Sequence, residues 1–189
     1  IIRAGIDVVA ESRVSNLKKL QHLPCQKCLL RTPSPSEIEE VVRYTDISLN
    51  SEVAVIQSLS REAVKPKTIH QVLLMVDMGD IREGSWFENR EYLEKAVKQT
   101  LELPNLELYG LGTNFGCYGS VNPTVENGRM FVRIARELEA KFGIRFKYIS
   151  GGNGTSYHLI EKGTWPGGIN HLRVGALHEF GIEYVDIRY

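Results

Sequence analysis

Short apolar runs alternate with amphipathic segments along the whole chain. The apolar runs predict seven strands, at residues 6–10, 28–30, 47–49, 72–76, 106–111, 146–149 and 172–174. The segments between them predict helices at 14–20, from 35 onward, and at 52–63, 90–103, 124–142 and 157–162. Every predicted strand except the last is therefore followed by a helix.

Two local signals support these helices. Ser34-Pro35-Ser36-Glu37 has the spacing of a capping box, with proline at the first helical position. Val53, Ile56 and Leu59 fall on one face of the predicted helix at 52–63. Both patterns are typical of helices that pack one side against a core.

The alternation of strands and helices predicts parallel pairing, because a crossover helix is needed to bring the next strand back in the same direction. Seven strands are one fewer than a closed (β/α)8 barrel contains. We therefore expect an α/β fold, a (β/α)8 TIM-type barrel lacking its first β/α unit, with the abrupt start at Ile1 falling inside that barrel. An open doubly wound sheet is the alternative.

The composition narrows the class of protein. Lys plus Arg and Asp plus Glu both number 23, so the formal net charge is zero. A nucleic-acid binder or a protein of anionic membranes would normally carry a basic excess, so we expect neither partner. No apolar run is long enough for a membrane span, and no signal peptide opens the chain. At 189 residues, one sizeable domain is expected.

The three cysteines are Cys25, Cys28 and Cys117. The first two form a lone C-x-x-C that could be half of a zinc site or a redox pair, but no second pair of ligands stands at a matching spacing. Cys28 also opens a predicted strand, where a buried thiol is common. An odd number of thiols without a disulfide framework is typical of a reducing, cytoplasmic setting.

Polar loops rich in glycine follow several predicted strands. They are Asp77–Gly84, Gly112–Gly119, Ser150–Asn153 and Arg173–Gly175. The turns before the strands, such as Lys65-Pro66-Lys67, are plainer. Because (β/α) barrels place their chemistry on the loops after the strands, a site is predicted at this face. Asp77 is expected to orient its own loop.

The stretch from Tyr148 to Gly175 carries the strongest of these signals. A short strand leads into a small-residue turn, Ser150–Gly154, and a helix then starts at Thr155 and Ser156. Glycines allow a close approach to the backbone, and N–H groups at a helix start favour an anion such as phosphate. An arginine at the end of the next strand would lie beside that anion. An ordinary strand–turn–helix connection is the alternative.

Taken together, the chain resembles the pyridoxal 5′-phosphate (PLP) enzymes with an alanine-racemase-type barrel, in particular their alanine/ornithine racemase branch. The resemblance rests on GIDVVAESRVSNLKKL, CLLRTPSPSEIEEVV, ISLNSE, LLMVDMGDIREG, ELYGLGTNFGCYG, ISGGN and GINHLRVG, which follow in this order over most of the chain. It implies a cytoplasmic, homodimeric racemase that interconverts L- and D-amino acids, with ornithine or alanine as substrate. The alternatives are a non-catalytic PLP-binding protein of the same barrel type and a decarboxylase or aldolase, which shares fewer of these sequence motifs.

The resemblance also implies roles for particular residues. Arg82 would contact the phenolic oxygen of the cofactor or the substrate carboxylate, and Asn114 would replace a histidine beside the pyridine ring. Arg173 would face the pyridine nitrogen, with a surface or salt-bridged arginine as the alternative. Arg82 could instead pair with Glu83 or Asp80, and Asn114 could be a turn residue. The expected phosphate contacts come from Gly152, Asn153, Thr155, Ser156 and a backbone N–H of Gly175.

Two departures from the family pattern affect what can be expected. The lysine that forms the Schiff base in this family is expected upstream of Ile1, because the lysines at 18, 19, 95, 98 and 141 fall on predicted helices and Lys147 is at the start of a predicted strand, at the wrong face. Residues 1–178 would form a partial PLP-binding barrel, and 179–189 would be a tail or the start of a C-terminal β domain. These residues alone are therefore not expected to complete racemisation.

Overall fold

The computed structural model describes residues 5–117 and 121–175, so the end of the predicted Gly112–Gly119 loop and the predicted tail at 179–189 lie outside the described residues. The chain forms two compact units. The first comprises Ile1–Leu74 and Lys95–Tyr109, and the second comprises Met75–Glu94 and Gly110–Tyr189. Each unit is described by itself below.

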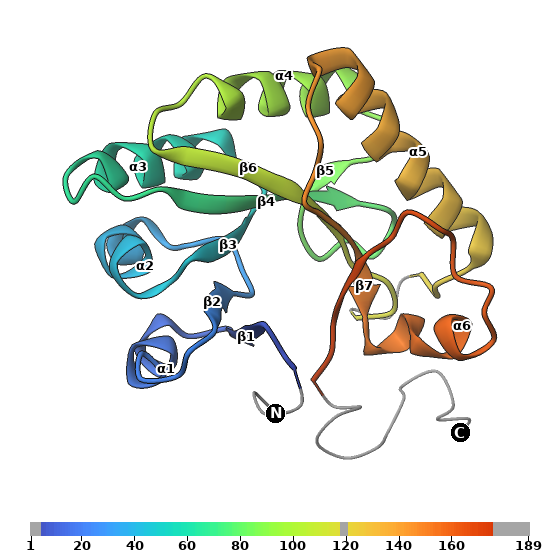
Figure 1. The fold of residues 1–189 in the computed structure, drawn as a ribbon. Helices are drawn as coiled ribbons and strands as arrows, with labels where there is room; N and C mark the ends of the chain where they lie inside the picture. The colour runs from blue at the N-terminus through green and yellow to red at the C-terminus, as the bar shows by residue number, and fades with distance from the viewer. Residues whose placement is uncertain (1–4, 118–120, 176–189) are drawn as a thin grey trace. The chain divides into compact units, whose positions relative to one another are not determined.

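The strands of the described residues follow one another in the order β1-β2-β3-β4-β6-β7-β8, with β5 paired to β4. Figure 1 labels the strands from β1 to β7. The registers of the neighbouring strands are parallel. A doubly wound sheet would reverse its strand order at a switch point, and this order does not reverse. The fold is therefore an incomplete TIM-type (β/α) barrel, as the sequence predicted, and the open-sheet alternative is wrong.

The first unit contains β1 (Val8–Glu11), α1 (Val14–Lys19), β2 (Gln26–Leu29), a 3₁₀ turn (Pro35–Glu37), α2 (Ile38–Tyr44), β3 (Ile47–Asn50), α3 (Val53–Val64), the start of β4 (His70–Asp77), most of α4 (Arg90–Leu101) and the start of β6 (Leu106–Thr113). Its core gathers Leu17, Leu29, Val41 and Leu59, all fully buried. These residues come from α1, β2, α2 and α3, so the apolar faces that the sequence pattern predicts form the core of this unit.

The second unit contains the end of β4, β5 (Ser85–Trp86), the end of β6, α5 (Val125–Phe142), β7 (Tyr148–Asn153), a 3₁₀ turn (Gly154–Ser156), α6 (Tyr157–Glu161) and β8 (His171–Arg173). The long helix α5 buries Phe131, Ile134 and Leu138 on one face. No helix of the described ranges 5–117 and 121–175 combines the length and apolar character that crossing a membrane requires.

Two local predictions are wrong. The sequence predicted a strand at 146–149 and a turn at Ser150–Gly154, but β7 begins at Tyr148 and continues through Asn153. The small residues extend the strand because Ser150 and its neighbour Gly151 pair in register with Gly112 and Thr113 of β6. The two-residue strand β5 was not predicted, because Ser85–Trp86 is too short to show a periodic pattern.

Candidate functional site

Three neighbouring strands of the second unit end in polar residues. Thr113 of β6 lies opposite Gly151 of β7, and Asn153 of β7 lies opposite Arg173 of β8. Because the strands are parallel, their carboxyl ends meet at the same edge. The register therefore brings the polar ends of β6, β7 and β8 together within one unit.

Arg173 is the centre of this group. Its half-buried guanidinium donates from Nη2 to the carbonyl oxygen of Thr113 at 2.6 Å and to Oδ1 of Asn114 at 2.8 Å. Nη1 donates to Oγ of Ser150. A Cβ on Gly112 would lie 2.6 Å from Sδ of Met75 and 3.5 Å from Nη1 of Arg173. Glycine at 112 therefore leaves room for the guanidinium beside β6.

Asn114 connects Arg173 to the loop after β4. Its Nδ2 donates to Oε1 of Glu83 at 3.1 Å, and that carboxylate lies 3.6 Å from Nε of Arg82. Arg82, which is more exposed, also donates from Nη1 to Sγ of Cys117 at 2.8 Å. The pairing of Arg82 with Glu83 that the sequence left open is therefore present, and it is part of a chain that reaches Arg173.

The loop that carries Arg82 is held by Asp77, the last residue of β4. Oδ1 of Asp77 accepts from the backbone N–H of Gly79 at 2.9 Å and from that of Ile81 at 3.1 Å. A carboxylate that accepts from two N–H groups of the loop that follows it fixes the direction in which the loop leaves its strand. The predicted orienting role of Asp77 is confirmed.

On the other side of Arg173, Ser150 contacts His171. Oγ of Ser150 lies 2.7 Å from Nδ1 of His171, whose ring stacks on Tyr148 with centroids 4.4 Å apart and planes at 21°. Burial, and then the positive charge of Arg173, lower the pKa of His171 to about 4. The imidazole is therefore neutral at physiological pH.

Residues 152–156, at the end of β7 and in the 3₁₀ turn that follows it, form a second group and are called the 152–156 loop. Thr155 Oγ1 donates to the carbonyl oxygen of Phe115 at 2.6 Å, and Asn153 Oδ1 accepts from the backbone N–H of Phe115 at 3.4 Å. Ser156 Oγ donates to the carbonyl oxygen of Gly151 at 3.3 Å. The Thr155 hydroxyl therefore donates to the loop after β6, and the Ser156 hydroxyl donates to β7.

Gly152 shapes the same loop through its backbone. Its φ is +108°, a conformation that L side chains rarely adopt, and a Cβ there would lie 2.7 Å from Oγ of Ser156. The loop can take this path only with glycine at 152.

The structure thus brings most of the predicted residues into two adjoining groups. Asn114 is hydrogen-bonded to both Arg173 and Glu83, and Glu83 forms an ion pair with Arg82. Gly152, Asn153, Thr155 and Ser156 form the second group. Gly175 is exposed, with open space where a Cβ would lie. Sequence reasoning gave Ser150 and His171 no role at the site. Alternation along β8 was the available signal, because residues 171 and 173 lie on the same face of a strand.

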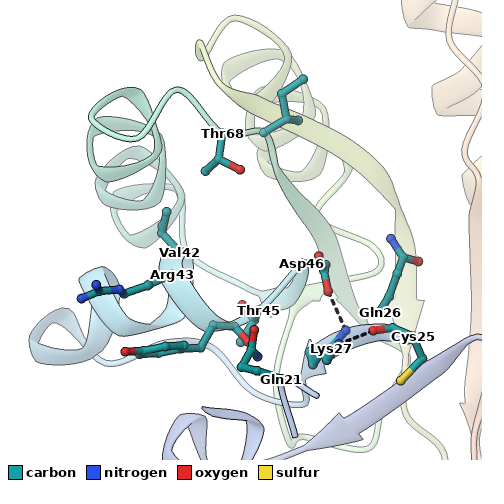
Figure 2. Close-up of a pocket in the computed structure, with 11 residues that line it drawn as sticks. Gln21, Cys25, Gln26, Lys27, Val42, Arg43, Thr45, Asp46 and Thr68 are labelled. Carbon is teal, nitrogen blue, oxygen red and sulfur yellow. Dashed lines mark hydrogen bonds between the residues drawn. The ribbon is translucent and has the colours of Figure 1, made fainter. Parts of the chain in front are cut away.

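A polar pocket of about 260 Å³ lies in the first unit, at the start of β2 and before β3 (Figure 2). Its Lys27 is buried, and Nζ donates to the carbonyl oxygens of Leu23 at 2.7 Å and Cys25 at 2.5 Å. The backbone N–H of Lys27 donates to Asp46 at 2.7 Å. In (β/α) barrels, residues at the amino ends of the strands usually contribute to stability rather than to catalysis. The contacts of Lys27 fit this role, because they hold the loop before β2 against its strand.

The C-x-x-C motif lies at the same place. Cys28 is buried in β2 and Cys25 is half-buried before it. Within the ranges 5–117 and 121–175, no group of three or more His, Cys, Asp or Glu side chains could hold a metal ion. The polar edge formed by β6, β7 and β8 is therefore the candidate site.

Comparison with known families agrees with this fold. The model of the family described as alanine racemase, N-terminal domain, matches residues 1–178. The chain belongs to this family. It is 45% identical over 178 residues to the ornithine racemase of Acetoanaerobium sticklandii, covering 94% of this chain and 50% of that protein. It is 35% identical over 188 residues to the lysine racemase of Thermotoga maritima, covering 98% of this chain and 51% of that protein.

The chain thus spans about half the length of the curated racemases that it matches. Among solved structures, it is similar to an alanine racemase of Clostridium difficile 630 in complex with cycloserine, with a TM-score of 0.73, 13% identity, and coverage of 92% of this chain and 47% of that one. It is also similar to PipY of Synechococcus elongatus PCC7942 with PLP bound, with a TM-score of 0.73, 19% identity, and coverage of 93% and 82%. At these identities the likeness shows the fold, and it confirms the predicted barrel.

Proposed function

We propose that this chain is the PLP-binding barrel of an amino-acid racemase. The observation that carries the proposal is Arg173, whose guanidinium is fixed by Thr113, Asn114 and Ser150 at the carboxyl ends of the strands. The family membership and the ornithine and lysine racemases that the chain resembles support the same reaction class. Ornithine is the favoured substrate, because the relative with 45% identity is an ornithine racemase.

The residues present fit PLP by the chemistry of their donors. A guanidinium only donates hydrogen bonds, so it suits a ring nitrogen that accepts one. The glycines at 112 and 152 leave space where a side chain would meet Met75 or Ser156. PLP, when bound, would supply the electron sink that lets the α C–H bond of an amino acid break.

Within that arrangement, Arg173 would bind the ring nitrogen without protonating it, because arginine does not give up its proton in proteins. An unprotonated ring withdraws electrons less strongly, which favours a clean return of the α-proton over side reactions. Asn114 would lie beside the ring. Arg82 would hold the phenolic oxygen or the substrate carboxylate, with Glu83 fixing its position.

The phosphate would lie at the loop of residues 152–156 and near Gly175. The hydroxyl protons of Thr155 and Ser156 are donated to backbone carbonyl oxygens, so these side chains offer acceptors rather than donors. A phosphate dianion needs donors. We therefore expect the backbone N–H groups of this loop and of Gly175, rather than the two hydroxyls, to supply the main phosphate contacts.

The remaining parts of the proposal come from the family resemblance. The Schiff-base lysine would lie upstream of Ile1, and a second base would come from a partner subunit in a cytoplasmic homodimer. The competing proposal is a PLP-binding barrel without turnover.

Three measurements on the full-length protein would test the proposal. PLP should give an absorbance that borohydride reduction fixes covalently on a lysine upstream of Ile1, and L-ornithine should be converted to D-ornithine, measured by chiral chromatography. Arg173→Glu should lower the racemisation rate by about 100-fold or more, because it replaces a fixed donor at the reacting group. It should also give a new visible absorbance band when amino acid is added.

Arg133→Glu makes the same charge change on the exposed side of α5 and is the matched control, with an expected rate close to that of the wild type. PLP binding without racemisation of ornithine, lysine or alanine would overturn the racemase proposal in favour of the binding protein. Labelling of Lys18, Lys95 or Lys141, which lie on helices, would contradict the assignment of the lysine.

A further inference from the structure

The hydrogen bonds on the far side of Arg173 have only one consistent direction. Arg173 donates to Oγ of Ser150, and an arginine cannot accept in return. The Ser150 hydroxyl has a single proton, and Nδ1 of His171 lies 2.7 Å away. Ser150 is fully buried, so its proton needs an acceptor, and among the described contacts of its hydroxyl Nδ1 of His171 is the group that can accept. We therefore assign Ser150 as the donor to Nδ1 and place the proton of the neutral His171 on Nε2.

The position of the imidazole is also fixed. Its ring stacks on Tyr148 of β7, and Ser150 and His171 lie directly opposite each other in the β7–β8 register. The groups that face His171 are the Tyr148 ring and the Ser150 hydroxyl from β7, and the Arg173 guanidinium from its own strand. With its ring stacked on Tyr148 and Nδ1 beside the Ser150 hydroxyl, His171 provides the acceptor for the Ser150 proton.

Loss of the acceptor nitrogen of His171 would also disturb the contact between Ser150 and Arg173. A protonated or acceptor-free residue at 171 would leave the Ser150 proton without a partner on that side. The hydroxyl would then turn toward the N–H groups of Arg173, where two donors repel each other. The Ser150 oxygen would then no longer be held as an acceptor for Arg173, whereas the contacts of the guanidinium with Thr113 and Asn114 would remain.

We infer that His171 is a positioning residue of the candidate site, which acts through the hydroxyl of Ser150 to hold the guanidinium of Arg173 in the orientation that would meet the cofactor ring. The inference rests on the proposed function, because only a bound ring gives that orientation a consequence. It assigns His171 no contact with the substrate and no transfer of a proton. Its effect is geometric, and it requires the acceptor nitrogen rather than the aromatic ring.

Two substitutions separate the acceptor from the ring. His171→Phe keeps an aromatic ring to stack on Tyr148 but removes Nδ1, whereas His171→Asn removes the ring and keeps an acceptor oxygen near the same position. In the full-length protein, His171→Phe should weaken PLP binding and lower kcat by about tenfold, the usual scale for losing a partner that orients a binding group. His171→Asn should recover most of this loss, and KM should change little in either variant.

A purely structural role would give the reverse order, with His171→Asn worse because it loses the stacked ring. PLP affinity is measured by fluorescence titration of the apoprotein, and unfolding in urea shows whether the two variants are equally stable. Exposed His22 provides the control, and His22→Phe should match the wild type. Equal PLP affinity and kcat in His171→Phe and the wild type would overturn the inference.

Nitrogen-15 NMR of the wild-type protein at neutral pH tests the relay without any variant, so the inference stays falsifiable even if His171→Phe does not fold. The expected result is a neutral imidazole with the proton on Nε2; a proton on Nδ1 would overturn the inference. This measurement also separates the two proposals. If the wild type neither binds PLP nor racemises amino acids, the proposed function fails, whereas the tautomer still reports on the contact between Ser150 and His171.

Discussion

His70 shows how one buried side chain can set the acid stability of this protein. It is 1% exposed in the first unit, and its Nε2 lies 2.8 Å from Oγ of Ser48. Burial, which disfavours the charged form, lowers the pKa of His70 to about 4, while the ordinary value is 6.5. The unfolded chain therefore binds a proton more readily than the folded one between these two values, and stability is lost as the pH falls through this window.

The expected cost follows from the two pKa values. Between pH 7 and pH 5, His70 should lower the free energy of unfolding by about 2 kcal/mol, since each pKa unit corresponds to about 1.4 kcal/mol. Urea unfolding at the two pH values measures this loss. His70→Gln should reduce the loss by about the same amount, whatever its effect at pH 7, and His22→Gln should leave the loss unchanged. An identical pH dependence in wild type and His70→Gln would contradict the prediction.

Helix α5 shows why some elements were predictable almost to the residue. Thr124 accepts from the backbone N–H of Asn127 at 3.1 Å, and Asn127 Oδ1 accepts in return from that of Thr124 at 2.8 Å. The helix ends at Phe142, followed by Gly143 in the left-handed conformation. Capping residues are present at both ends of α5, so the sequence alone was enough to predict where this helix begins and ends. Strand β7 has no such marks: its pairing with β6 reaches Gly151, and its pairing with β8 reaches Asn153, where the strand ends.

The cap of α5 has a measurable effect. Thr124→Ala should lower the free energy of unfolding by about 1 kcal/mol, because the N–H of Asn127 then loses its side-chain acceptor. Thr124→Ser keeps the hydroxyl and should stay within about 0.5 kcal/mol of the wild type. Urea unfolding at pH 7 measures both variants. Equal losses in the two would show that packing of the threonine methyl group, rather than capping, stabilises this end of the helix.

At the scale of the whole molecule, the alternation of strands and helices was sufficient to predict an α/β fold with parallel strands. The strand order was needed to separate the barrel from the doubly wound sheet. The site was predictable only in part. Arg173, Asn114 and Arg82 could be placed by resemblance, but Ser150 and His171 depend on the register between β7 and β8, which no local pattern contains. Glu83 likewise gains its role from a partner 31 positions away in the sequence.

The proposed racemase also predicts an assembly. If the second base comes from a partner subunit, the full-length protein should sediment at twice the protomer mass, and dilution that separates the subunits should abolish racemisation while PLP stays bound. Analytical ultracentrifugation with activity measured over the same concentration range checks this. A protein that is monomeric and fully active would contradict the two-subunit site, and a PLP-bound monomer without activity would support the binding-protein alternative.

The chain of contacts through Asn114 has consequences for anyone who wishes to redesign the site. Arg173 can only donate and a carboxylate at 83 can only accept, so the amide of Asn114 has one possible orientation. Asn114→Asp alone would face two carboxylates toward each other, whereas Asn114→Asp combined with Glu83→Gln would restore a donor opposite an acceptor. Positions 83 and 114 must therefore be substituted together, because changing residue 114 to aspartate first would place two carboxylates next to each other.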